Sequence, residues 1–189
     1  MRFRNAGEFG QHFSKSTIGI VGMGNIGFEI AKRAHFGFGC NILYHNRKPR
    51  DTAALVNAKY YSTLNEMVPE CDFICVVCNL SAETKDIISN DQFDLMKDTA
   101  ILCNVSRGGT VNQDALYDAL NTNSIFGAAL DVTTPEPLPR DHKLLTCNNL
   151  IITPHWGTAT KIAVMEMLGI AIDNINSALS NEKMVSELL

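Results

Sequence analysis

The sequence predicts an α/β fold: a doubly wound parallel sheet with helices on both faces and a long C-terminal helix. Short apolar runs rich in β-branched residues recur along the chain, and segments with helical periodicity separate them. A glycine-rich turn joins the first such run to the first helical segment. This alternation of strands and helices is typical of a parallel sheet that is covered on both faces.

The first predicted strand, Thr17–Val21, precedes a helix expected over Ile26–Phe38, which presents an apolar residue every fourth position. Glu29 and Arg33 lie one turn apart on the exposed side of that helix and form a supporting pair. Asn112 has the place and chemistry of the N-cap of a later helix. Further strands are predicted at Ile42–Tyr44, Phe73–Val77, Ala100–Cys103, Phe126–Leu130 and Leu150–Ile152.

The alternation of predicted strands and helices does not extend to the two ends of the chain. Residues 1–15 lack a clear period and are interpreted as a lead-in segment, residues 16–157 as a dinucleotide-binding domain, and residues 158–189 as a C-terminal helix and tail. The long helix is expected over Thr158–Ser180 as a core helix against the sheet. Its apolar stripe is wide, so another interpretation is that part of it faces a second domain or subunit.

Composition excludes several classes of protein. The chain has 189 residues, 46% of them hydrophobic and 19% charged, which is an ordinary globular balance. A net charge of −4 gives no support for nucleic-acid binding. No secretory signal is recognisable, and no stretch is expected to reach the roughly 20 apolar residues of a spanning helix. We therefore expect a cytoplasmic protein that contacts neither nucleic acid nor membrane.

Six cysteines occur, and Cys75 and Cys78 have a C-x-x-C spacing. Within a strand, residues three apart point to opposite faces, so these two side chains should diverge. A second C-x-x-C that would complete a zinc site is not found in the sequence. Most of the cysteines are interpreted as small buried apolar residues, with no disulfide and no metal expected.

The turn Gly22-Met23-Gly24-Asn25-Ile26-Gly27 has the G-x-G-x-x-G spacing of a Rossmann dinucleotide-binding fold. Gly22 permits the tight turn, Gly24 lets the backbone approach a pyrophosphate, and Gly27 allows close packing of helix on strand. Asn25 and Ile26 open the helix whose N-terminus then faces the phosphates. A glycine turn without a ligand is the alternative, which the flanking strand and helix disfavour.

The end of the second strand predicts the choice of cofactor. An acidic residue there would bind the ribose hydroxyls of NAD, but Asn46 and Arg47 occupy the place and no carboxylate occurs before Asp51. An arginine can grip a 2′-phosphate with paired hydrogen bonds. The sequence thus predicts NADP, with NAD less favoured; the alternative is a solvated basic turn.

Polar residues follow several predicted strands at their carboxyl ends, where open α/β sheets bind ligands. Arg107, Asp131 and His155 each come just after or at the end of a strand, and Glu136 lies in the loop after Asp131. Because parallel strands bring these ends to one edge, the convergence favours an enzyme.

Four ordered motifs resemble the D-isomer-specific 2-hydroxyacid dehydrogenases, and most of all the glyoxylate/hydroxypyruvate reductase branch. They are the turn Gly22–Gly27, Asn104-Val105-Ser106-Arg107-Gly108-Gly109, Asp131-Val132-Thr133-Thr134-Pro135-Glu136-Pro137, and Thr153-Pro154-His155-Trp156-Gly157. The resemblance implies NADPH-dependent reduction of a small 2-oxo acid.

The resemblance also implies roles. His155 would be the general acid that protonates the carbonyl oxygen, and Glu136 would pair with it and fix its tautomer. Arg107 would bind the 2-oxo acid and polarise its carbonyl. Asp131 would orient the nicotinamide through its carboxamide.

Members of this family have a substrate domain largely N-terminal to the glycine turn, and only 21 residues precede Gly22 here. We therefore expect a cofactor domain without most of its substrate domain, slow in turnover alone, and a homodimer in the full-length protein. The alternative function is a non-catalytic dinucleotide-binding or interaction module, as in the related co-repressors.

Overall fold

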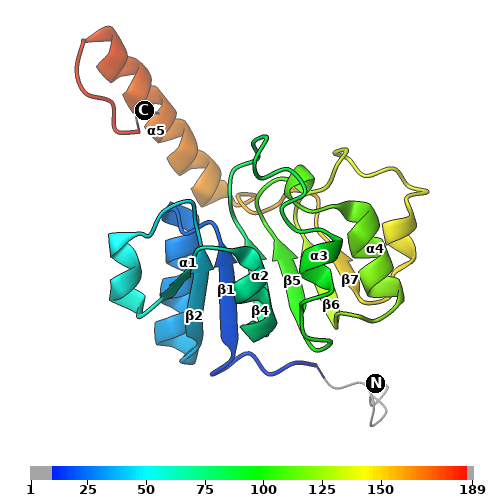
Figure 1. Ribbon diagram of the computed structural model, residues 1–189. Helices are drawn as coiled ribbons and strands as arrows, with labels where there is room; N and C mark the ends of the chain where they lie inside the picture. Colours follow the sequence, from blue (N-terminus) through cyan, green and yellow to red (C-terminus); the bar gives the residue numbers. More distant parts are fainter. Residues whose placement is uncertain (1–9, 187–189) are drawn as a thin grey trace, which may run out of the picture. The chain divides into compact units, whose positions relative to one another are not determined.

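The computed structural model describes residues 10–186, which divide into two compact units (Figure 1). One unit ends at Pro154 and the other begins at His155. Residues 1–9 of the predicted lead-in segment lie outside the described residues.

The first unit is built on seven parallel strands in the order β3-β2-β1-β4-β5-β6-β7 (Figure 1). The order reverses between β1 and β4, which is the switch point where such sheets bind ligands. The predicted doubly wound sheet is confirmed; only the three-residue β3 was not predicted. The strands are β1 (Thr17–Val21), β2 (Asn41–His45), β3 (Lys59–Tyr61), β4 (Phe73–Val76), β5 (Ile101–Asn104), β6 (Gly127–Leu130) and β7 (Leu150–Ile152).

Helices connect the strands. The predicted first helix is α1 (Asn25–Phe38), and α4 (Gln113–Asn121) begins as predicted after Asn112, whose Oδ1 accepts from the amide of Ala115 at 3.0 Å. Shorter elements complete the connections: α2 (Leu64–Met67), α3 (Asn90–Phe93) and the 3-10 turns η1 (Asp51–Val56), η2 (Val68–Glu70), η3 (Gly108–Thr110) and η4 (Lys143–Thr146).

Two apolar clusters, one on each face of the sheet, hold the first unit together. Successive residues of a strand belong to different clusters: Ile20 packs with α1 and η1, whereas Val21 packs with α2, α3 and α4. The expected helices on both faces are therefore present. Burial of these apolar side chains stabilises the fold by about 25 cal/mol per Å² removed from water.

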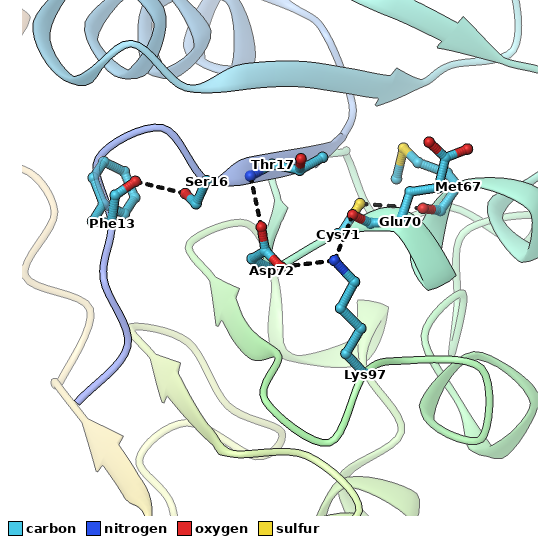
Figure 2. A network of polar contacts seen from close by, with 8 residues as sticks. All are labelled: Phe13, Ser16, Thr17, Met67, Glu70, Cys71, Asp72 and Lys97. Atoms are coloured by element: carbon cyan, nitrogen blue, oxygen red, sulfur yellow. Dashed lines mark hydrogen bonds and ion pairs between the residues drawn. The ribbon is translucent and has the colours of Figure 1, made fainter. Parts of the chain in front are cut away.

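A polar latch ties the amino ends of β1, β4 and β5 together, at the edge opposite the predicted ligand site (Figure 2). The Asp72 carboxylate accepts from the Thr17 amide at 2.8 Å and from Lys97 Nζ at 2.7 Å. Lys97 Nζ also donates to the Glu70 carbonyl at 3.0 Å. Burial raises the pKa of Asp72, but the Lys97 and Thr17 hydrogen bonds outweigh it, so the pKa is lowered overall.

The second unit contains α5 (Lys161–Leu179), capped by Thr160, whose Oγ1 accepts from the Ala163 amide at 3.1 Å. The predicted helix is present, and within its own unit none of its residues is buried. Its packing as a core helix stays a prediction. Contrary to expectation, α5 is also long and apolar enough to cross a membrane by length and composition. A single helix of this kind is weak evidence for a membrane protein.

We expect Asp72→Asn to lower the free energy of unfolding at pH 7 by about 1 kcal/mol, because the latch is only partly exposed. The lowered pKa of the folded state sets the sign of the pH dependence. The contribution is fully present above the unfolded pKa and is lost as the pH falls through the folded value. In urea unfolding, the free energies of unfolding of wild type and Asp72→Asn should thus become equal as the pH falls below about 4.

The exposed pair between Lys32 and Glu29 provides a control, since an exposed ion pair contributes about 0–1 kcal/mol. Equal losses from Lys97→Met and Lys32→Met would contradict the assignment of a special role to the latch.

Candidate functional site

The glycine turn lies where β1 ends and α1 begins, and two of its glycines are required by close contacts. Gly22 has φ of +106°, and a Cβ there would meet the Cys78 amide nitrogen at 2.7 Å. A Cβ on Gly27 would meet the Gly22 carbonyl oxygen at 2.2 Å. Without side chains at these positions, α1 starts directly against β1 and the end of β4.

Gly24 is different, because a Cβ there would meet nothing within 4 Å. It is exposed and is the N-cap of α1, where it has no side chain to accept from the first-turn amides of Ile26 and Gly27. Such amides and the helix dipole favour a phosphate. The open space in front of Gly24 therefore fits the pyrophosphate of a dinucleotide.

Asn46 links the glycine turn to the basic turn after β2. Its Oδ1 accepts from the Met23 amide at 2.8 Å, and its own carbonyl accepts from the Tyr60 hydroxyl at 3.1 Å. The Tyr44 hydroxyl accepts from the Arg50 amide at 3.0 Å. These contacts hold both ends of the turn that carries Arg47.

Arg47 is exposed on this turn, and its charge acts on Glu83 in the loop after β4. A hydrogen bond from Ser81, and in smaller part the charge of Arg47, lowers the pKa of the Glu83 carboxyl. The guanidinium thus lies at the same edge of the sheet as the glycine turn, with its charge open to solvent.

A buried hydrogen-bond network fixes the loop that carries Arg107. Asn104 Oδ1 accepts from the amide and the hydroxyl of Ser106, at 3.0 and 2.8 Å, and its Nδ2 donates to the Arg107 carbonyl at 3.1 Å. The Thr110 hydroxyl donates to the same carbonyl at 2.7 Å. Arg107 itself is exposed, with Nη1 donating to the Ser106 carbonyl at 2.7 Å.

The loop after β6 packs directly against the Arg107 loop. A Cβ on Gly108 would meet the Thr133 carbonyl oxygen at 2.0 Å, so glycine is needed there. Glu136 Oε1 accepts from the Thr133 amide at 2.9 Å, which anchors that carboxylate to its own loop. Asp131 Oδ1 accepts from the Thr153 hydroxyl at 2.5 Å, which ties the ends of β6 and β7.

The structure therefore brings most of the predicted site residues to one rim. Going along the carboxyl edge, contacts join Asn46 to Met23, Gly22 to Cys78, and the Arg107 loop to the Asp131–Glu136 loop. Over the described residues 10–186, no group of three or more His, Cys, Asp or Glu side chains could hold a metal ion.

His155 is the first residue of the second unit. It is exposed, and its φ of 56° lies in the left-handed region that residues other than glycine rarely adopt. Strained conformations of this kind cluster at functional sites. The pairing of His155 with Glu136 stays a prediction.

Sequence reasoning missed the residues that position the rim, above all Asn104, Thr110 and Gln113. Gln113 makes two hydrogen bonds with the backbone of Thr134, at 2.6 and 2.9 Å, which hold the loop after β6 against the start of α4. The sequence does single out Asn104 as a candidate site residue, because it is a polar residue that ends an apolar strand three positions before Arg107.

Comparison with known proteins identifies the family. Residues 2–157 match the NAD-binding domain of the D-isomer specific 2-hydroxyacid dehydrogenases. The chain belongs to this family. A human glyoxylate reductase/hydroxypyruvate reductase is 45% identical over 181 residues, which are 95% of this chain and 55% of the relative.

Solved structures agree with this assignment. A protein of Thermus thermophilus superimposes with a TM-score of 0.88 at 34% identity, over 100% of this chain and 58% of that protein. An NADPH-dependent glyoxylate/hydroxypyruvate reductase of Sinorhizobium meliloti, in complex with NADP and malonate, superimposes with a TM-score of 0.84 at 32% identity. The match covers 92% of this chain and 53% of that protein. The chain spans little more than half the length of these relatives.

We expect Gly27→Ala to destabilise the first unit by about 1–3 kcal/mol, because the new methyl group would overlap a backbone oxygen. Gly24→Ser should leave the stability within a few tenths of a kcal/mol of wild type, since the space is open and serine is a good N-cap. Chemical unfolding of both variants tests the contrast. Similar losses would show that Gly24 is also packed.

Proposed function

We propose that this domain binds NADPH and serves the reduction of a small 2-oxo acid, with His155 as general acid. The observation that carries the proposal is the carboxyl rim of the sheet. There the uncapped start of α1 lies at the same edge as Arg47, Arg107 and Asp131, in a chain of a dehydrogenase family.

The preference for NADP rests on the residues after β2. A 2′-phosphate needs a positive charge close to the ribose, and Arg47 is exposed on a turn whose ends are fixed by Asn46 and Tyr44. The sequence His45-Asn46-Arg47 offers no carboxylate that would bind the ribose hydroxyls of NAD or repel the phosphate.

Bound NADPH would supply the hydride. Asp131, held by Thr153, would accept a hydrogen bond from the nicotinamide carboxamide and orient the ring. Arg107 would bind the substrate carboxylate and stabilise the negative charge that develops on the carbonyl oxygen. His155 would donate the proton that this oxygen needs, with Glu136 holding the imidazole in the donating tautomer.

The substrate class follows from charge and size. A guanidinium at the rim favours an anionic substrate, and the names of the relatives support glyoxylate or hydroxypyruvate. We also propose a cytoplasmic location and, for the full-length protein, a homodimer.

Arg47→Ala should weaken NADPH binding about 10- to 100-fold and leave NADH binding unchanged, because a charge-assisted hydrogen bond contributes about 1.5–3 kcal/mol. Fluorescence titration of both cofactors measures the effect. The neighbouring exposed Lys48→Ala is the matched control and should change neither affinity.

Gly24→Ser separates the two parts of the cofactor site. Its hydroxyl would take up the helix amides that both cofactors need, so NADPH and NADH should weaken alike. Tighter binding of NADH than of NADPH by the unaltered chain would overturn the NADP preference.

His155→Gln should lower hydroxypyruvate-dependent NADPH oxidation by at least about 100-fold, the usual contribution of a general acid, while the NADPH Kd stays the same. Both quantities are measured on the same preparation of the chain. Turnover that is unchanged in the variant would show that His155 is not the acid.

A further inference from the structure

Cys75 and Cys103 are direct neighbours on adjacent parallel strands. Strands β4 and β5 are neighbours in the sheet (Figure 1). Cys75 of β4 stands opposite Cys103 of β5 in the register of the sheet, and both cysteines are free. Adjacent strands lie about 4.8 Å apart. This separation falls within the Cα–Cα range of about 4.4–6.8 Å that disulfides span.

The two side chains point to the same, less covered face of the sheet. In both strands burial alternates: Cys75 and Cys103 are half-buried, whereas their neighbours Ile74 and Leu102 on the other face are fully buried.

On the face of the sheet that carries the two cysteines, side chains become more exposed from β1 towards β7. On one side Cys75 stands opposite Ile20, which is 0% exposed under α1. On the other side Cys103 stands opposite Ala129, which in turn faces Ile151, 68% exposed. Within the first unit taken by itself, the pair thus lies where the cover of this face ends, and both thiols are partly exposed there.

We propose that Cys75 and Cys103 form a reversible disulfide when the protein meets a peroxide, and are a redox-reactive site that lies next to the dinucleotide rim without being part of it. The first step is attack of the Cys103 thiolate on a peroxide oxygen. The O–O bond breaks, and Cys103 becomes a sulfenic acid. The leaving hydroxide takes up the proton that the Cys103 thiol released on ionising and so becomes the first water.

In the second step the Cys75 sulfur attacks the Cys103 sulfur. The S–S bond forms, the S–O bond breaks, and the oxygen leaves as a second water with the Cys75 proton. Two thiols are oxidised by two electrons, and hydrogen peroxide is reduced to two waters. A thiol reductant reverses the change through thiol–disulfide exchange.

Thiol acidity supports this order of events. A hydrogen bond from the Cys75 thiol lowers the pKa of Cys103, although burial and the charge of Asp131 oppose it. The same hydrogen bond, together with burial, raises the pKa of Cys75. By contrast, burial raises the pKa of Cys78 and of Cys147. Reactivity toward peroxide follows the thiolate, so Cys103 is the nucleophile and Cys75 the resolving thiol.

The test is mass spectrometry of the native full chain after brief treatment with hydrogen peroxide and alkylation of the remaining thiols. We expect a species that is lighter by two hydrogens before alkylation and carries two fewer alkyl groups. Trypsin should release a cross-linked pair of peptides, 60–85 and 98–107, that dithiothreitol separates.

Variants assign the bond, because Cys71 and Cys78 share the first peptide. Cys75→Ser and Cys103→Ser should abolish the cross-link, and Cys78→Ser and Cys71→Ser should keep it. Cys75→Ala and Cys103→Ala, with unfolding curves of all variants, separate loss of the thiol from loss of the fold. A cross-link that survives in folded Cys75→Ser or Cys103→Ser, or sulfinic acid without a cross-link in wild type, would overturn the proposal.

Discussion

Helix α1 starts against the ends of β1 and β4 at a separation that leaves no room for a side chain at Gly22 or Gly27. This contact decides where the first turn of the helix points and how far its amides lie from the sheet edge. Asn46 binds the backbone of the same turn, so the position of the basic turn after β2 depends on it as well. The position of the phosphate-facing amides and that of the turn carrying Arg47 therefore depend on the same packing constraint.

The other half of the rim is arranged by a different means. Here buried polar groups do the positioning: Asn104 and Thr110 hold the Arg107 loop through its own carbonyl, and Gly108 lets the loop after β6 come into contact with it. Within the described part of the chain, each buried side-chain nitrogen or oxygen has a partner, which is the condition under which such a network makes a loop rigid. A rigid loop spares the backbone entropy that would otherwise be lost when Arg107 binds an anion, so only the rotamers of its side chain remain to be ordered.

Much of this fold could be predicted from the sequence because its signals are local. The apolar runs of β1 and β7, the periodicity of α1 and the cap at Asn112 each depend on neighbouring residues, and the structure has them at or within a residue of the expected place. Strand β3 was missed because Lys59–Tyr61 is too short to show a period. The role of Asn104 was missed because it depends on Thr110 and on the path of the loop, and a residue spacing does not reveal a hydrogen-bond partner. The surface that α5 contacts could not be predicted from its sequence, since a wide apolar stripe is compatible with several partners.

The latch of Asp72 and Lys97 and the ligand rim lie at opposite ends of the same strands. Substitutions of the exposed side chains at the rim, such as Arg47 and Arg107, therefore leave the latch and the two apolar clusters intact. Exposed residues that would contact ligands can therefore change at one edge without disturbing the contacts at the other edge that keep the domain folded. A lineage built on such a domain can diversify its chemistry without first having to accumulate compensating mutations elsewhere.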